Sequence, residues 1–282
     1  MKKKIAPDEA TDIVFMNTII SASRRPRRPH LLAAHQRATA AYASYEDALT
    51  STGQLVPVTM TDEEHDAYFD LYDSEAVNVI AAKTEVARLF GIDYCPYCRI
   101  EPTLPLDHFL PRSKFPEFSI STRNLVPSCT TCNTVHKKAR WGIGPNRPFL
   151  HPYFDAFPAI LYLRCMVQVQ PATPNAPGSL IVGFTIDKTG CTTSQLLEQV
   201  DQIERHFTEM DLNTRYINKV TMEILPALGR LLASQANQAE REENVNHYIH
   251  SGINSSDLNT WEKAFFTALA PLAAILSAGN WP

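Results

Sequence analysis

Four of the six cysteines in this 282-residue chain form two Cys-x-x-Cys pairs, CPYC at Cys95 and Cys98 and CTTC at Cys129 and Cys132. Thiolates at this spacing are the ligands of closed structural Zn²⁺ sites, in which two such pairs complete a tetrahedron. The segment between the pairs is rich in proline and poor in large apolar residues, so a metal is needed to hold its shape. We therefore predict a structural zinc site with these four cysteines as ligands.

Oxygen and nitrogen donors lie between and just after the two cysteine pairs. Asp107 and His108 are adjacent in the run PLDHFLPRSKFP, and Asn133 directly follows Cys132. Carboxylate and amide oxygens are hard donors that suit Mg²⁺ or Mn²⁺, and a neutral imidazole accepts a proton from water near neutral pH. These are the parts of a phosphodiester hydrolase, in which a metal on Asp107 and Asn133 stabilises the leaving 3′ oxygen and His108 acts as general base.

Positive charge gathers in the same segment of an otherwise acidic chain. The net charge of the whole chain is −4, but residues 95–147 carry eight lysines and arginines against three acids. A local basic region suits a polyanion, because phosphate contacts depend on nearby charge. Arg112, Lys114 and Lys137 are the expected phosphate contacts. A second basic cluster, SRRPRRPH at residues 23–30, favours a solvated loop, and contact with nucleic acid or an acidic partner stays open.

The run LDHFLPRSKFPEFSISTRNLVPSCTTCNTVHKK resembles the HNH, or ββα-metal, endonuclease motif with the zinc-binding cysteine pairs that many members carry. The resemblance covers about residues 91–141. It implies that Asp107 is a metal ligand, that His108 is the general base, and that Asn133 is the second metal ligand, at a position that is often His. It also implies that Asn124 ties the loop and orients the histidine. The implied substrate is DNA, most simply double-stranded.

The sequence around the motif, including KFPEFSI and HPYFD, is similar more loosely to the HNH nuclease subunits of Septu-type anti-phage defence systems in bacteria. This resemblance implies a nuclease that works with an ABC/SMC-like ATPase. The sequence is compatible with such a partner, since it contains no P-loop GxxxxGK[ST]. The alternative is a non-catalytic, zinc-stabilised module that binds DNA or protein. Whether His136 or His151 joins the site stays open.

The elements that position these residues are expected to form an α+β fold. It is mostly helical, with a zinc-stapled ββα finger in the centre and a β-hairpin after it. Within the finger, TLPLDHF reads as a strand and CTTCNTVHKKAR as a helix with Ser128 near its N-cap. The cysteines then pin the start of the helix against the strand, so that Asn133 faces Asp107 and His108.

Helices are expected on both sides of the finger, giving regions 1–90, 91–150 and 151–282. On the N-terminal side, LLAAHQRATAAYASYEDALTSTG predicts a helix that stops near Gly53. Thr61 and Glu64 have the spacing of a capping box, and SEAVNVIAAKTEVARLFG predicts a helix capped by Ser74 that ends at Gly91.

On the C-terminal side, AILYLRCMVQVQ and SLIVGFTID predict a β-hairpin around the loop PATPNAPG. Helices follow Thr193, and Pro226 should kink one of them. The apolar tail 264–279 is shorter than the roughly 20 residues that span a bilayer, so we expect a buried or partner-facing helix. Without a recognisable secretory signal, and with metal-type cysteine spacing, the chain is expected to be cytoplasmic and free of membrane contact.

Overall fold

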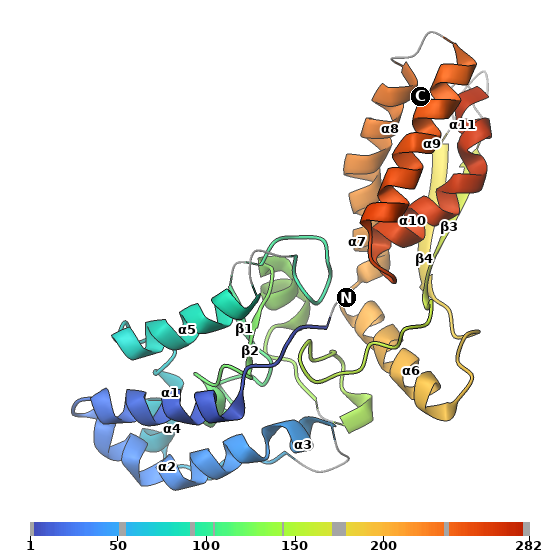
Figure 1. Cartoon of the computed structure of the whole chain (residues 1–282). Coiled ribbons are helices and arrows are strands. Elements are labelled where there is room, and N and C mark those ends of the chain that lie inside the picture. Colours follow the sequence, from blue (N-terminus) through green and yellow to red (C-terminus); the bar gives the residue numbers. More distant parts are fainter. Residues whose placement is uncertain are drawn as a thin grey trace. The chain divides into compact units, whose positions relative to one another are not determined.

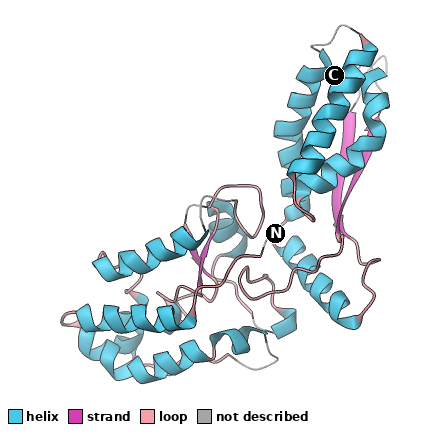
Figure 2. Ribbon diagram, in the orientation of Figure 1, coloured by secondary structure: helices cyan, strands magenta, loops and turns pink. Residues whose placement is uncertain are grey.

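The computed structural model describes residues 3–50, 55–90, 94–103, 105–142, 144–170, 179–233 and 237–278. Contacts within the chain divide it into two compact units, Met1–Phe157 and Pro158–Pro282. Helices dominate both units, and each holds one small two-stranded antiparallel sheet (Figures 1 and 2). The predicted α+β, mostly helical class is therefore confirmed. The predicted boundary at residue 90 does not separate compact units, because the N-terminal helices and the cysteine-rich segment belong to the same one.

The first unit begins with five helices: α1 Glu9–Ala22, α2 Arg27–Ala43, α3 Tyr45–Thr50, α4 Asp62–Phe69 and α5 Val77–Phe90. The capping box is confirmed at α4, where the Thr61 side chain accepts from the Glu64 amide and the Glu64 side chain accepts from the Thr61 amide. The cap predicted at Ser74 is wrong by two residues. Its hydroxyl accepts from the Ala76 amide, which forms a turn ahead of α5.

Aromatic side chains from α2 and α3 form much of the core of this unit. The Tyr42 ring stacks on Phe118 at 5.5 Å between centroids, and the Tyr45 ring meets Phe118 edge-on at 4.9 Å. The helix predicted to run from Leu31 to Gly53 is interrupted at Ser44, which separates α2 from α3. Its predicted end at Gly53 lies outside the described residues. The interruption lets both tyrosines face the loop that follows the first strand.

The cysteine-rich segment contains two three-residue strands, β1 Leu106–His108 and β2 Leu125–Pro127, paired antiparallel with Asp107 opposite Val126. A short helix with π-type hydrogen bonding, Thr131–Lys137, follows. Single 3₁₀ turns lie at Pro116–Phe118 and Gly144–Asn146. The strand is shorter than TLPLDHF, and the helix begins after the first cysteine of its pair.

Ser128 does not cap that helix, contrary to expectation. The N-cap position is Thr130, whose side chain makes no capping bond. The Ser128 amide instead donates to the Pro105 carbonyl, which extends the pairing of the two strands by one hydrogen bond. The Ser128 hydroxyl is buried without a hydrogen-bond partner among the described residues.

The second unit holds the predicted hairpin, β3 Leu163–Gln170 and β4 Ser179–Ile186, paired antiparallel over their full lengths. The loop PATPNAPG lies outside the described residues. The helices are α6 Ser194–Glu209, α7 Leu212–Lys219, α8 Leu225–Ala233, α9 Gln238–Ser255, α10 Trp261–Leu269 and α11 Ala273–Ala278, with a π segment at Val220–Ile224 and a 3₁₀ turn at Ala270–Leu272. A helix follows Thr193, as the sequence indicated, and the Thr193 side chain caps it by accepting from the Leu196 amide.

The helix around Pro226 and the apolar tail can both be compared with the sequence predictions. Ahead of Pro226 the helix widens into the π segment, where the Leu225 amide bonds to the Val220 carbonyl, so the chain adapts to a residue without an N–H. The apolar tail forms α10 and α11, and Phe265, Leu269 and Leu276 are buried, which confirms a buried helix. None of the helices in the described parts of the chain has the length and apolar character needed to cross a membrane.

Candidate functional site

The four predicted zinc ligands lie together and are buried. Their sulfur atoms all lie within 4.8 Å of one another. Four Zn–S bonds of about 2.3 Å in a tetrahedron place the sulfurs about 3.8 Å apart, and the Cys98 and Cys129 sulfurs are 3.8 Å apart. Backbone amides also point at the sulfurs, that of Ile100 at Cys98 and that of Cys132 at Cys129, both at 3.4 Å. The residues therefore fit a structural zinc ion.

Three of the residues predicted to carry chemistry line one pocket. Asp107 and His108 come from β1 and Asn133 from the short helix, and all three face a surface pocket of about 300 Å³. The pocket is also lined by Arg112, from the loop after β1. The short helix thus brings Asn133 to the strand that holds Asp107 and His108, as the sequence predicted.

His108 is half-buried and held in one orientation. Its Nε2 lies 2.8 Å from the Ser119 carbonyl, and its ring packs edge-on against Tyr72 at 4.4 Å. A carbonyl only accepts, so Nε2 carries the hydrogen and the lone pair is on Nδ1. Burial lowers the pKa of His108 to about 4, although the Ser119 carbonyl opposes part of the shift. The imidazole is therefore neutral near pH 7, the form that accepts a proton.

Asp107 is only 2% exposed, and both of its carboxylate oxygens have partners. The Tyr97 hydroxyl donates to Oδ2 at 2.8 Å, and the Lys137 ammonium contacts Oδ1 at 3.1 Å. Burial raises the pKa of Asp107 above its ordinary value, while Lys137 and Tyr97 oppose the rise. The carboxylate is thus a hard donor of the right type for Mg²⁺ or Mn²⁺, but an internal cation already neutralises it.

Asn124 is fully buried and holds the loop that follows β1. Its Oδ1 accepts from the Leu110 amide at 2.8 Å and from the Tyr45 hydroxyl at 2.9 Å. Its Nδ2 donates to the carbonyls of Leu110 and Phe118 at 3.1 and 3.2 Å. The Asn124 side chain bonds to this loop, which also carries Ser119, so its influence on the imidazole passes through the loop.

The three basic residues expected at phosphate have different positions. Arg112 lines the pocket, with its guanidinium 2.7 Å from Asp73 and over the Phe69 ring at 4.2 Å. Lys114 is exposed over the Trp141 ring and is not among the pocket-lining residues. Lys137 differs most from expectation, because its side chain is fully buried against Asp107. Of the three, Arg112 alone is among the residues that line the pocket.

The two histidines whose roles stayed open lie away from the pocket. His136 is half-exposed on the short helix and is not among the pocket-lining residues. His151 is fully buried, with its ring 4.2 Å from the Phe109 ring and its Nε2 3.3 Å from the Tyr45 hydroxyl. Burial lowers the pKa of His151 well below its ordinary value. His151 therefore packs the core behind the loop that Asn124 holds.

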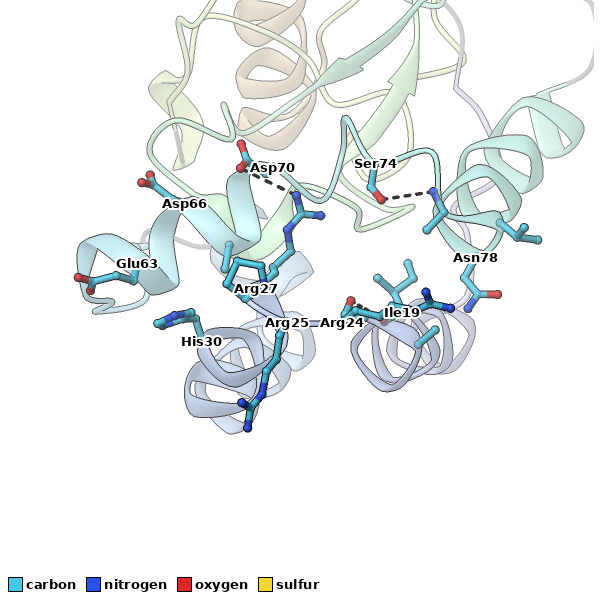
Figure 3. A pocket seen from close by; sticks show the side chains of 16 residues that line it. Ile19, Arg24, Arg25, Arg27, His30, Glu63, Asp66, Asp70, Ser74 and Asn78 are labelled. Carbon is cyan, nitrogen blue, oxygen red and sulfur yellow. Dashed lines mark hydrogen bonds and ion pairs between the residues drawn. The ribbon is translucent and has the colours of Figure 1, made fainter.

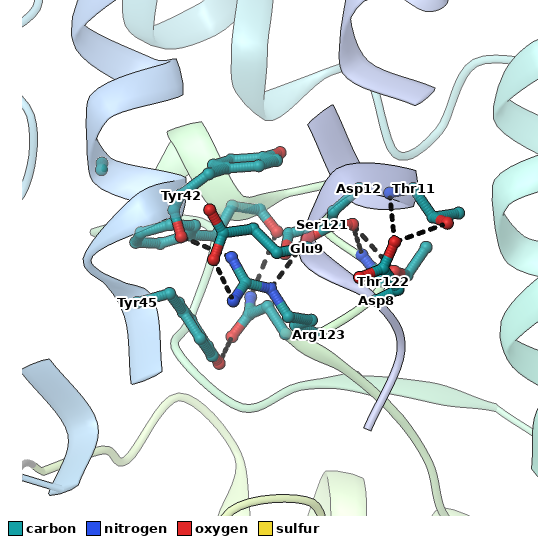
Figure 4. Close-up of polar contacts among 12 residues, drawn as sticks. Asp8, Glu9, Thr11, Asp12, Tyr42, Tyr45, Ser121, Thr122 and Arg123 are labelled. Carbon is teal, nitrogen blue, oxygen red and sulfur yellow. Dashed lines mark hydrogen bonds and ion pairs between the residues drawn. The ribbon is translucent and has the colours of Figure 1, made fainter. Parts of the chain in front are cut away.

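A buried polar network connects α1 to that loop (Figure 4). The Asp12 carboxylate accepts from the Ser121 hydroxyl and from the amide and hydroxyl of Thr122. Arg123 lies 3.5 Å from Asp12 and also donates to the Tyr42 carbonyl. The N-terminal helix thus anchors the turn between Ser119, which holds His108, and Asn124.

The basic cluster at residues 23–30 borders a larger cavity of about 720 Å³ (Figure 3). Arginines of the α1–α2 turn form one wall, and acids of α4 and the turn after it form another; Figure 3 shows Arg27 directed at Asp70, 3.9 Å away. Such a mixed lining favours neither an anion nor a cation. The lining includes His30, Asp70 and Asn78 but no cysteine.

Comparison with known proteins identifies one partial relative. The chain is 30% identical over 123 residues to protein ea31 of Escherichia phage lambda, a match that covers 43% of this chain and 39% of the phage protein. The chain therefore spans about two fifths of the length of that relative. No family model matches the chain. No solved structure matches it.

Some contacts of the site have weak signals in the sequence. Tyr97 lies inside the CPYC pair, which indicates a position near the metal but not a hydrogen bond to Asp107. Ser119 acts through its backbone carbonyl, which no side-chain pattern reveals. Asp12 is 110 residues from Thr122, and only the folded chain brings them together.

Proposed function

We propose that this chain is an HNH-type endonuclease that hydrolyses phosphodiester bonds of DNA, built on a zinc-stapled ββα finger. The observation that carries the proposal is the common pocket of Asp107, His108 and Asn133, beside a four-cysteine cluster. The order of strand, strand and helix agrees with this proposal. Zn²⁺ is its structural cofactor, and Mg²⁺ or Mn²⁺ is the cofactor for hydrolysis.

The residues of the chain divide the work as follows. His108 accepts the proton of the attacking water at Nδ1, while the Ser119 carbonyl keeps the ring oriented. Arg112 binds a phosphate oxygen by exchanging its contact with Asp73, which is largely exposed. A divalent metal on Asp107 and Asn133, when bound, stabilises the charge of the leaving 3′ oxygen.

A plasmid-nicking assay with Mg²⁺ or Mn²⁺ tests this function. The zinc-loaded chain should convert supercoiled DNA to open circles, and His108→Ala should lower the rate by at least about a hundredfold, because it removes the base. His136→Ala is the matched control, since it removes a histidine of the same segment that does not line the pocket. Equal nicking by His108→Ala and the native chain, at equal zinc content, would refute the assignment.

The second candidate is a non-catalytic zinc module that binds DNA or protein. The observation that favours it is the satisfied carboxylate of Asp107, which Tyr97 and Lys137 already occupy. This candidate predicts DNA or protein binding without cleavage at any divalent-metal concentration. DNA binding by electrophoretic mobility shift, measured beside the nicking assay, separates the two.

We further propose that the nuclease acts in the bacterial cytoplasm with an ABC/SMC-like ATPase in anti-phage defence. The support is the resemblance of the sequence around the motif and the absence of a P-loop from this sequence. Co-purification with the product of the adjacent gene tests the partner. Full activity of a monodisperse lone monomer, unchanged by that product, would count against it.

A further inference from the structure

Lys137 has an environment that is unusual for a lysine. Its side chain is 0% exposed, and that of its partner Asp107 is 2% exposed. The ammonium has two oxygen contacts, Asp107 Oδ1 at 3.1 Å and the His108 carbonyl at 2.7 Å. A buried ammonium is stable only when it is paired and hydrogen-bonded, and both conditions are met here.

The helix explains why Lys137 reaches this place. Lys137 lies four residues after Asn133, so the two side chains share the face of the short helix that lies over β1. Asn133 borders the open pocket, whereas Lys137 lies beneath it against the buried side of Asp107. The helix therefore places a neutral oxygen donor at the pocket and a cation against the Asp107 carboxylate.

Two cations cannot share this carboxylate without repulsion. A divalent ion on Asp107 would lie within a few ångströms of the Lys137 ammonium in a poorly hydrated place, where charges are weakly screened. The Tyr97 hydroxyl occupies the other carboxylate oxygen. An ion that binds here must displace the Lys137 ammonium, or else repulsion between the two cations lowers the affinity for the ion.

We propose that Lys137 is an internal counter-ion that competes with the divalent metal for Asp107 and so sets the metal affinity of the site. The proposal rests on the proposed function, since that function puts the metal on Asp107. The site keeps a positive charge beside Asp107 with or without metal. Lys137 is thus a positioning residue: it keeps the empty carboxylate buried and β1 in place, and it limits metal binding to high metal concentration.

Mn²⁺ binding to the zinc-loaded full chain, measured by electron paramagnetic resonance, tests the proposal. Lys137→Met removes the competing charge while keeping a long side chain, and should tighten Mn²⁺ binding by about tenfold or more. Lys138→Met is the matched control, because Lys138 also lines the pocket but is exposed; its affinity should stay close to that of the native chain. Asp107→Asn added to Lys137→Met should abolish the gain.

The outcomes separate this inference from the proposed function. If native chain and Lys137→Met bind Mn²⁺ equally well, and Asp107→Asn abolishes both, the metal site stands and the competition is refuted. If neither binds Mn²⁺, both the competition and the metal-dependent nuclease are refuted. If Lys137→Met loses its zinc or its fold, the native chain provides the test. A crystal structure of the native chain with saturating Mn²⁺ should place the Lys137 ammonium away from Asp107. An ion and the ammonium both in contact with the Asp107 carboxylate would overturn the proposal.

Discussion

His108 illustrates how burial and one hydrogen bond together fix the orientation and the charge state of an imidazole. Its ring is fixed at Nε2 by the Ser119 carbonyl and packed against Tyr72, while its Nδ1 carries the lone pair. Burial keeps the imidazole neutral far below its ordinary pKa. This shift lowers the free energy of unfolding at acidic pH, because the unfolded chain takes up a proton at pH values where the folded chain does not.

This shift predicts a pH dependence of folding. The pKa of His108 is about 4 in the folded chain against an ordinary value of 6.5, so between these values the unfolded state binds more protons. The free energy of unfolding is therefore highest above about pH 6.5 and falls as the pH drops from about 6.5 to about 4, by up to about 1.4 kcal/mol per pH unit for this group, and levels off below. When the free energy of unfolding, measured by urea denaturation, is plotted against pH over this range, its slope should be shallower for His108→Gln than for the native chain. Parallel slopes would contradict the shift; His151, unchanged in both chains, contributes equally.

Asn124 permits a second prediction at this scale. Its side-chain amide makes four hydrogen bonds inside the core, so Asn124→Ala removes the partner of the Leu110 amide and carbonyl and one bond each from the Tyr45 hydroxyl and the Phe118 carbonyl. We expect a loss of about 3 kcal/mol in the free energy of unfolding, since buried polar groups without partners are costly. Guanidinium denaturation measures it. Thr134→Ala, on an exposed position of the short helix, should cost less than about 1 kcal/mol.

At the level of secondary structure, the two cysteine pairs belong to separate elements. The first pair lies in a turn before β1, and the second pair spans the start of the short helix, so one ion would join both to a common point. The strands are only three residues long, and such short pairing is weak on its own. The pocket therefore depends on contacts around the strands: the four-cysteine cluster, which fits a zinc ion, and the loop held by Asn124 and Asp12.

Removing one ligand should accordingly disrupt the pocket. Cys132→Ser is expected to lose zinc and to lower the thermal stability of the cysteine-rich segment, because three ligands hold the ion far less tightly. Zinc content by atomic emission and hydrogen exchange of residues 94–142 measure both effects. Cys165→Ser is the matched control, since Cys165 lies in β3 of the other unit. Unchanged zinc content in Cys132→Ser would exclude the four-cysteine site.

For the whole molecule, the division into two compact units has a thermodynamic consequence. The four cysteines and the pocket all belong to Met1–Phe157, while the hairpin and helices α6 to α11 belong to Pro158–Pro282. Each unit has its own buried core, so each can unfold with its own transition.

Calorimetry in the presence of a zinc chelator tests this division. The chelator should lower the melting temperature of one transition by several degrees or more and leave the other in place. Cys132→Ser without chelator should reproduce the same selective change. A single transition that moves as a whole would mean that the units unfold together.

The sequence was sufficient for patterns that are local. The cysteine spacing, the capping box at α4 and the alternation of the hairpin follow from residues close in the chain, and the structure confirms the close grouping of the cysteines and both elements. The burial of Lys137 depends instead on packing between a helix and a strand, so its charge alone suggested a phosphate contact. The Asp12 network joins residues far apart in sequence, and no local pattern encodes it.

Tyr97 lies between the two cysteines of the first pair, and its hydroxyl reaches Asp107. The turn that would bind zinc therefore also holds the Asp107 carboxylate of the proposed active site. A cell starved of zinc would release this turn and, with it, the carboxylate. The zinc supply of the cell would then determine how firmly the Asp107 carboxylate is held in the pocket.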